Sequence, residues 1–310
     1  MKGKDFLSIA DLDSADIVRL LDRAQAMKEG RLIGSPLSGK TLALVFEKPS
    51  LRTKVSFDVA MYQLGGHAIY LSDAEVGLGK REPIADAARV LSRYVDGIAA
   101  RTFSHAALQE LARYATVPVI NALSDAEHPC QALGDLLTVR EKKGQLKGVT
   151  LAFVGDGNNV AASLMLACAT VGMHFRIACP SGYLMPEAFR RRAKALGSAS
   201  GGSILCTQDP MAGVRGTDVV YTDVWTSMGQ EAEAHQRRQV FAPYQVTEAL
   251  LAAAGPQAIL MHDLPAHPGE ELAPGLIDSP RSVVFDQAEN RLHIQKAILV
   301  ELMGKAAQKI

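Results

Sequence analysis

Cysteine is scarce in this sequence, and the few that occur form no recognisable metal or disulfide pattern. Cys130, Cys168, Cys179 and Cys206 lie inside apolar runs or at an expected helix start, without the paired spacing of a zinc motif. We therefore expect reduced, buried thiols in a protein of a reducing compartment, which predicts a cytoplasmic location.

Long apolar runs and an excess of one charge are also missing. No stretch approaches the roughly 20 apolar residues of a membrane-spanning helix, and the N-terminus has no apolar segment of signal-peptide length. The 33 basic and 33 acidic residues cancel to a formal net charge of +0. Neither nucleic acid nor a membrane is therefore an expected partner, and any anion must be bound by local groups.

What the sequence does contain is a regular alternation of apolar runs and helical patterns over 310 residues. Near-continuous apolar strands between helices predict parallel sheets that are covered on both faces. Because two such series occur, the expected fold is α/β, with two doubly wound parallel-sheet domains joined by interdomain helices. The expected strands are 42–46, 68–71, 97–100 and 117–120, followed by 149–154, 175–179, 203–206, 219–222 and 259–261.

The two expected domains comprise residues 1–128 and 129–289. No low-complexity linker separates them. Instead, residues 129–143 have apolar side chains at helical spacing and predict an interdomain helix. A second amphipathic helix is expected at 290–303; it could pack back on either domain, and we group residues 290–310 with the first.

The most informative motif follows the first strand, where an apolar run ends in Pro49, Ser50, Leu51, Arg52 and Thr53. The next residues recur at helical spacing, so free backbone N–H groups would face one small volume at the helix start. Ser50 and Thr53 add hydroxyl groups there, and Arg52 adds a planar fork that suits phosphate or carboxylate. The alternative is an ordinary helix with a Ser or Thr cap and solvated basic side chains.

Polar residues also gather after other strands, where open parallel sheets bind their ligands. The first domain offers Arg52, Arg101 and His128 to an anion, and the second offers Asp223 and Asp263 to a cation, at a cleft expected between the domains. Taken singly, Arg101 could pair with a surface carboxylate, and His128 could merely neighbour a helix start. The full set after strands is Ser50 to Thr53, Arg101, Asn121, His128 to Gln131, Gly155 to Asn159, Asp223 to Gly229, and His262 to Pro265.

The glycines in 155–157 do not make a dinucleotide fingerprint. Val160 occupies the place of its third glycine, and the next strand ends in Cys179 rather than in an acidic residue that would hold a ribose. A nicotinamide cofactor is therefore not expected. The loop 226–230 has too few apolar residues to be core, and we expect it to act as a mobile lid.

Taken in order, these motifs resemble those of the aspartate/ornithine carbamoyltransferase family over nearly the whole chain. Ser50–Thr53 matches its carbamoyl-phosphate motif, and His128–Gln131 matches its second signature. Asp223–Gly229, which reads DVWTSMG, and His262–Ala266 are similar to the ornithine-using members. The aspartate-using relatives lack the Ser-Met-Gly loop and usually have an arginine at the position of Ala266.

The resemblance implies transfer of a carbamoyl group from carbamoyl phosphate to the δ-amine of L-ornithine, which gives citrulline and phosphate in arginine metabolism. It implies no metal, no cofactor, and a homotrimer or a multiple of trimers. Domain 1–128 would bind carbamoyl phosphate, and domain 129–289 would bind ornithine.

The resemblance also implies a role for individual residues. Arg101, His128 and Gln131 would polarise the carbonyl, whose oxygen becomes negative in the tetrahedral intermediate. The implied catalytic residues are Arg101, His128, Gln131 and Asp263. The implied carbamoyl-phosphate ligands are Ser50, Leu51, Arg52, Thr53, Arg101, His128, Gln131, Leu264 and Arg291. The implied ornithine ligands are Asn159, Asp223, Ser227 and Met228.

Two positions depart from the family pattern. Lys54 replaces the final arginine of Ser-x-Arg-Thr-Arg, which keeps the charge but loses the fork. Asp263 stands where ornithine carbamoyltransferases carry a cysteine beside the reacting amine. A carboxylate could attract the δ-ammonium and accept its proton, but it would also raise the pKa of the amine, so we expect activity with an altered pH profile. The stretch 75–82, which in relatives can face a neighbouring subunit, has Gly77 and Lys80 near the place of a common glutamine.

Three alternative activities remain open. A putrescine carbamoyltransferase would need no contact to an α-carboxylate, which the presence of Asn159 and the Ser227 loop argues against. An N-acylornithine would leave Asp223 without an ammonium group to bind. A protein inactivated at Asp263 would bind carbamoyl phosphate but form no product. The biosynthetic or catabolic direction is not encoded, because both run the same chemistry.

Overall fold

The computed structural model describes residues 4–32 and 34–304, which form two compact units. Unit 1 is drawn from residues 1–134 and 290–310, and unit 2 is residues 135–289. Helix α6 (Pro129–Lys143) begins in unit 1 and ends in unit 2, at the place where the sequence predicts an interdomain helix. Helix α12 (Val284–Met303) begins in unit 2 and ends in unit 1, whereas the sequence groups its C-terminal helix with the first domain alone. The division falls within α6, shortly after position 128. Helix α12 begins six residues earlier than expected.

Unit 1 is built on a four-stranded parallel sheet in the order β2-β1-β3-β4. Its strands are β1 (Thr41–Phe46), β2 (His67–Ser72), β3 (Gly97–Arg101) and β4 (Val119–Leu123). β4 starts two residues later than predicted, because Pro118 has no N–H to donate to the ladder, although its carbonyl accepts from Ile98. Asn121, expected after this strand, therefore lies buried within it, opposite Ala100.

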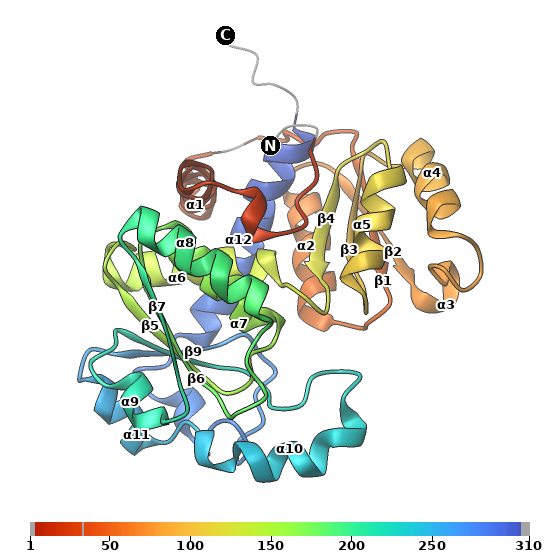
Figure 1. The fold of residues 1–310 in the computed structure, drawn as a ribbon. Helices are drawn as coiled ribbons and strands as arrows, with labels where there is room; N and C mark the ends of the chain where they lie inside the picture. The colour runs from red at the N-terminus through yellow and green to blue at the C-terminus, as the bar shows by residue number, and fades with distance from the viewer. Residues whose placement is uncertain (1–3, 33, 305–310) are drawn as a thin grey trace. The chain divides into compact units, whose positions relative to one another are not determined.

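Both faces of this sheet are covered by helices (Figure 1). Residues alternate between the two faces, so Val45 and Ile98 pack beneath α4 and α5. Gly97 points to the opposite face, where a Cβ atom would lie 2.8 Å from the sulfur of Met303 on α12, so glycine permits the close approach of that helix. The helices of unit 1 are η1 (Ile9–Asp11), α1 (Ser14–Lys28), α2 (Leu51–Gln63), α3 (Asp73–Val76), α4 (Ile84–Tyr94) and α5 (His105–Tyr114).

Unit 2 contains a five-stranded parallel sheet in the order β7-β6-β5-β8-β9. One face packs on a core that includes Trp225, Phe241 and Leu251, and the other packs on α7, every residue of which from Val160 to Thr170 is buried. The strands are β5 (Thr150–Val154), β6 (His174–Ala178), β7 (Ser203–Thr207), β8 (Val219–Thr222) and β9 (Ile259–His262). The helices are α7 (Asn159–Thr170), α8 (Glu187–Ser200), α9 (Pro210–Val214), η2 (Glu231–Glu233), α10 (Ala234–Phe241), η3 (Ala242–Tyr244), α11 (Glu248–Ala254) and η4 (Leu276–Asp278).

The point at which the strand order reverses indicates where each sheet would bind a ligand. In unit 1 the order reverses between β1 and β3, and in unit 2 it reverses between β5 and β8. In doubly wound sheets the crevice at such a reversal is the usual ligand site. All nine expected strands occur in two parallel sheets, so the predicted fold class is confirmed. Among the described residues, no helix has both the length and the apolar character needed to cross a bilayer.

Candidate active site

The first turn of α2, at the end of β1, forms one part of the site in unit 1. The Ser50 hydroxyl caps the helix by accepting from the Thr53 N–H at 3.3 Å, and it donates to the Thr53 hydroxyl at 2.9 Å. Arg291 reaches the same hydroxyl from α12 with its Nη2 atom. Hydroxyl and guanidinium donors from segments far apart in the sequence therefore meet at the positive end of a helix, which favours an anion.

Leu51 and Arg52 occupy the same turn but differ in how they can act. The Leu51 side chain is 74% exposed, so it can serve an anion at this site only through its backbone N–H. The Arg52 side chain is partly exposed and lies in the first turn of the helix, where its guanidinium can move to a ligand.

Arg101, His128 and Gln131 form the second part of the site in unit 1. Arg101 is the last residue of β3, whereas His128 directly precedes α6 and Gln131 lies in its first turn; all three side chains are buried. Burial lowers the pKa of His128 well below its ordinary value, and the positive charges of Arg291 and Arg101 lower it further. His128 is therefore neutral near pH 7 and can donate a hydrogen bond without adding charge.

The segment before His128 is fixed by the N-terminal part of the chain. The buried Glu127 carboxylate accepts from the Ser8 hydroxyl at 2.5 Å and from the Ile9 N–H at 3.0 Å. Cys130 lies 3.5 Å from the Asn121 carbonyl oxygen, and burial raises its pKa to about 12. Cys130 thus packs as a neutral thiol and is unsuited to act as a nucleophile.

Two lysines near the α2 motif lie against aromatic rings. The ammonium group of the buried Lys48 is 4.5 Å from the centre of the Phe103 ring. That of Lys54, which replaces the usual arginine, is 3.8 Å from the centre of the Tyr70 ring on β2. Both contacts have cation–π geometry and restrict where each charge can go.

In unit 2, Asp223 follows β8 and is held by the turn between β5 and α7. Its Oδ2 atom accepts from Asn158 at 2.7 Å, and its Oδ1 atom accepts from the Val224 N–H at 2.7 Å. Asn158 also caps α7 with its side-chain oxygen. Asn159, which the sequence assigns to ornithine, accepts from the Val160 N–H at 3.0 Å with its side-chain oxygen, whereas Asn158 lies in the same predicted turn but has no assigned role there.

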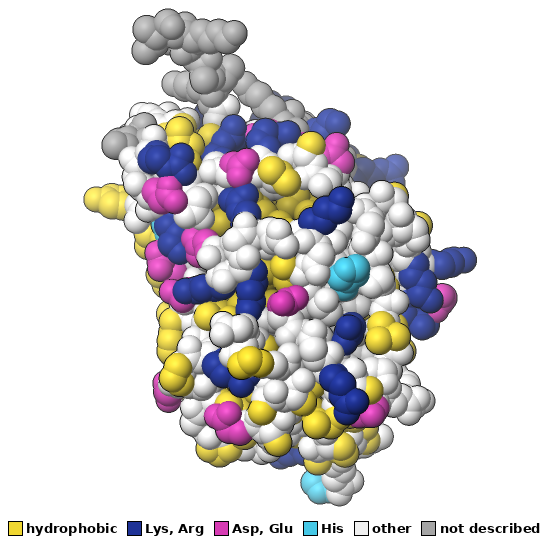
Figure 2. Space-filling view, turned by 90° about the vertical axis from the view of Figure 1, so that its left-hand side faces the viewer, with side chains coloured by type: hydrophobic (Ala, Val, Ile, Leu, Met, Phe, Trp, Pro, Cys, Tyr) yellow, Lys and Arg dark blue, Asp and Glu magenta, His cyan; other side chains and the backbone are white. Residues whose placement is uncertain are grey.

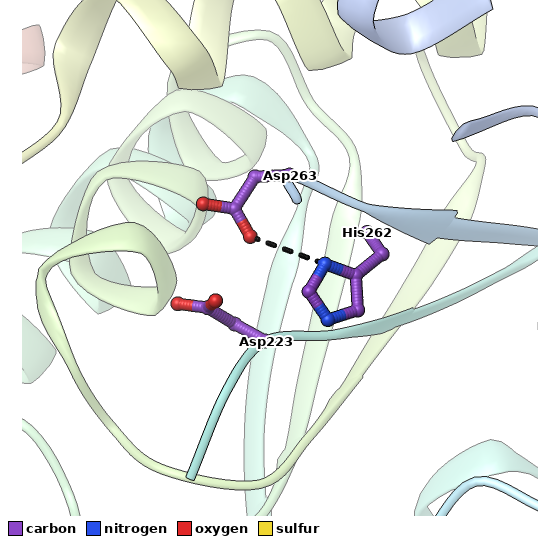
Figure 3. Close-up of side chains that lie close together, drawn as sticks. All are labelled: Asp223, His262 and Asp263. Atoms are coloured by element: carbon purple, nitrogen blue, oxygen red, sulfur yellow. Dashed lines mark ion pairs between the residues drawn. The ribbon is translucent and has the colours of Figure 1, made fainter. Parts of the chain in front are cut away.

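Asp263 follows the neighbouring strand β9, and Figure 3 shows its carboxylate beside that of Asp223. Asp223, His262 and Asp263 each have a polar atom within 4.8 Å of the others, and the Asp263 side chain is only 13% exposed. Two carboxylates so close together are suited to a cationic partner.

Hydrogen bonds at His262 argue against a metal ion as that cation. The Nδ1 atom accepts the Leu264 N–H at 2.9 Å, so its lone pair is already used. The proton of the neutral ring is therefore on Nε2, which lies 3.1 Å from Glu271 Oε1. His262 consequently has no nitrogen to offer a metal, and we interpret the two carboxylates as an ammonium site.

The same bonds fix the backbone at Leu264. Leu264 has φ of 61°, a left-handed conformation that costs about 1 kcal/mol or more for a residue with a side chain. Burial alone would raise the pKa of Glu271, but hydrogen bonds from His262 and from the His267 N–H outweigh it, so this pKa is lowered and the carboxylate stays ionised. Glu271 thus supports the Leu264 turn through His262, and no motif in the sequence marks it for this role.

The loop 226–230 lies beyond Asp223. The Ser227 N–H donates to the Gln230 side chain at 3.1 Å, the Gly229 N–H donates to Glu231, and the Met228 side chain is 42% exposed. In the described part of the chain, Ser227 bonds within this loop rather than to Asp223. The movement of the loop as a lid stays a prediction.

The formal net charge of +0 means that an ion must be attracted by nearby charged groups rather than by the charge of the whole protein. On the face shown in Figure 2, basic and acidic side chains are interspersed. Any attraction for an anion in unit 1 or for a cation in unit 2 would therefore have to come from the few groups described above.

Comparison with known proteins agrees with this division of charges. The aspartate/ornithine carbamoyltransferase carbamoyl-P binding domain model matches residues 4–141, and the Asp/Orn binding domain model of the same family matches residues 147–302. An ornithine carbamoyltransferase of Anoxybacillus flavithermus is 56% identical over 306 residues, 98% of each chain, and an anabolic one of Pyrococcus furiosus is 53% identical over 307 residues, again 98% of each. A solved ornithine carbamoyltransferase from Pyrococcus furiosus superimposes with a TM-score of 0.95 at 52% identity and 98% coverage of both chains. The chain belongs to the aspartate/ornithine carbamoyltransferase family.

Proposed function

We propose that this protein is an ornithine carbamoyltransferase, which transfers the carbamoyl group of carbamoyl phosphate to the δ-amine of L-ornithine and forms L-citrulline and phosphate. The observation that carries the proposal is the carboxylate pair of Asp223 and Asp263. Ornithine brings two ammonium groups to such a site, whereas aspartate would bring two carboxylates and be repelled. The names and identities of the full-length relatives support the same substrate.

Unit 1 would bind carbamoyl phosphate. The α2 turn with Ser50, Arg52 and Thr53 suits the phosphate, and the Leu51 N–H points to the same helix end. Arg101, His128 and Gln131 would donate to the carbonyl oxygen, which gains negative charge in the tetrahedral intermediate, so donors fixed in advance stabilise the transition state more than the substrate. The direct bond of Arg291 to Thr53 supports its assignment to this site.

Unit 2 would bind ornithine. Asp223, with Ser227, would accept from the α-ammonium, Asn159 would donate to the α-carboxylate, and Met228 would cover the chain. Asp263 would hold the δ-ammonium and accept its proton. The neutral amine then attacks the carbonyl carbon, and the Leu264 carbonyl would accept a hydrogen bond from the carbamoyl NH2 group. The C–O bond to phosphate breaks, the second proton of the attacking nitrogen passes to the departing phosphate, and citrulline remains.

The direct test is product formation with matched acceptors. Carbamoyl phosphate is incubated separately with ornithine, putrescine, aspartate and acetylornithine, and each ureido product is measured together with phosphate. We expect product with ornithine alone, because each of the other amines lacks at least one of the three groups that Asn159, Asp223 and Asp263 would bind. Equal turnover of acetylornithine or putrescine would reject the assigned roles of these residues.

We also propose a homotrimer located in the cytoplasm. Exposed apolar side chains on α2 and on the edge strand β2, namely Leu51, Val55, Tyr62 and Ile69, support an interface between copies. The absence of disulfides among the four cysteines, all of which lie in the described chain, supports a reducing compartment. Light scattering should give three times 33.2 kDa or a multiple of that mass.

A further inference from the structure

Arg237, on α10, is a buried cation with contacts to two segments of the ornithine half-site. Only 3% of the residue is exposed. Its Nε atom donates to the Trp225 carbonyl oxygen at 2.5 Å, and its Nη2 atom pairs with the Asp156 carboxylate. The guanidinium also lies 5.0 Å from the centre of the Tyr183 ring. A single side chain therefore fixes the backbone before loop 226–230 and the turn after β5.

Both partners of Arg237 lead directly to residues of the proposed ornithine site. Trp225 is buried against Phe241 and immediately precedes Thr226 and Ser227. Asp156 stands two residues before Asn158, whose side chain holds Asp223 at 2.7 Å. A shift at Arg237 would move both segments at once.

Stability alone does not account for this buried pair. Burial raises the pKa of Asp156 to about 6, Arg237 opposes that rise, and Asp223 adds to it. An ionised Asp156 therefore lowers the stability of the fold near neutral pH, although Arg237 partly compensates. Buried ion pairs are often no more stabilising than apolar residues of the same volume, and they fix geometry instead in some proteins.

The shape of the arginine fork is needed for the two contacts. Nε and Nη2 are separate donors on one rigid plane, so Arg237 can bond to Trp225 and to Asp156 simultaneously. A lysine would present one ammonium group at the end of a flexible chain and could not hold both partners in that geometry.

We propose that Arg237 is a positioning residue for the amino-acid substrate, fixing the base of loop 226–230 against the β5–α7 turn so that Asp223 and Ser227 are correctly placed for the substrate ammonium group. The inference rests on the proposed function and deepens it. Because Arg237 itself touches no reacting atom, its loss should weaken amino-acid binding more than it slows the chemical step.

The test compares Arg237→Lys and Arg237→Met with Arg238→Met. Arg238 lies on the same helix but is a surface residue that pairs with Glu270 at 2.8 Å, so it is the matched control. Trp225 is the only tryptophan and precedes loop 226–230, so its fluorescence is the probe used to follow ornithine binding without turnover. We expect about a tenfold or greater rise in the KM and Kd for ornithine in both Arg237 variants, from the loss of a charged hydrogen bond, with little change in kcat.

Carbamoyl phosphate binding, measured by calorimetry, should stay unchanged in all three variants, because it depends on unit 1. If Arg237→Met does not fold, Arg237→Lys and Asp156→Asn decide the question by the same two readouts. Unchanged ornithine affinity, or a fall in kcat without a rise in KM, would overturn the inference. If the wild type binds ornithine but forms no citrulline, the proposed function fails. The role of Arg237 is then still tested by comparing ornithine binding, measured by fluorescence, between the wild type and the Arg237 variants.

Discussion

Replacement of Asp263 by asparagine removes a negative charge from the proposed amine site without changing the size of the side chain. An ammonium group that reaches the space between Asp223 and Asp263 would lie close to two carboxylates (Figure 3). The substrate amine would then keep its proton to higher pH than it does in water. The Asp263→Asn enzyme should therefore reach full rate at lower pH.

The magnitude follows from the geometry. Opposite charges about 4 Å apart interact by about 4 kcal/mol at the effective dielectric constant of about 20 that suits protein sites. Part of this gain is lost to desolvation, and measured shifts for such pairs are about 1 to 3 pKa units. We expect the acidic limb of kcat/KM for ornithine to move down by about that amount, and the KM at neutral pH to rise because the bound ammonium loses a partner.

The assay is the initial rate of citrulline formation from about pH 6 to 10, the range in which side-chain amines and the substrate titrate. Asp263→Cys introduces the residue that the family resemblance implies for this position, and it should move the limb in the same direction. Asp286→Asn is the control, because Asp286 is a partly exposed residue of unit 2 that pairs with Lys142. If neither Asp263 variant changes the limb or the KM for ornithine, Asp263 does not contact the amine.

Three further predictions follow from the buried charges. Arg291→Lys loses the fork that reaches Thr53 and should weaken carbamoyl phosphate binding about tenfold or more in calorimetry, while an equal affinity would remove Arg291 from the site. His128 has a lowered pKa, so the unfolded chain takes up its proton first and stability falls as pH drops below about 6.5; His128→Gln should show a smaller loss of melting temperature between about pH 6.5 and 5. Asp156 has a raised pKa, so the native state takes up its proton first; the unfolding free energy of the wild type minus that of Asp156→Asn should fall from about pH 4 to about 6 and then level off. A difference in urea unfolding that is independent of pH would contradict the last of these.

The fold could be predicted from the sequence because each strand is short, apolar and bounded by polar residues. The strand β8 matches the expected range 219–222 at both ends, and helix α6 likewise matches 129–143. The predicted strand ends are wrong where an apolar run includes a residue that cannot take part in the sheet. Pro118 looked like part of an apolar run but cannot donate to the ladder, so β4 begins after it and takes in Asn121.

The proposed ligand residues could be predicted from the sequence where they follow a strand or match a motif. The residues that support them could not. Asn158 could have been selected as the helix cap after β5, since asparagine is a preferred cap. Glu271 and Arg237 lie in stretches with no periodic or motif signal, and their roles come from partners 9 and 81 residues away. Such contacts depend on the tertiary fold, which a single sequence does not specify by local pattern.

The protonation states of His128 in unit 1 and Glu271 in unit 2 suit the substrate that each unit would bind. In unit 1, His128 is kept neutral by burial and by neighbouring arginines, so the groups that face an anion are cations and neutral donors. In unit 2, Glu271 stays ionised and lies against His262 Nε2, which leaves Nδ1 to accept from the Leu264 N–H and to anchor the Leu264 turn. Asp223 and Asp263 therefore place two carboxylates at the proposed amine site. For this reason Asp263, rather than the anion site, is the position at which this chain should differ most in behaviour from relatives with cysteine there.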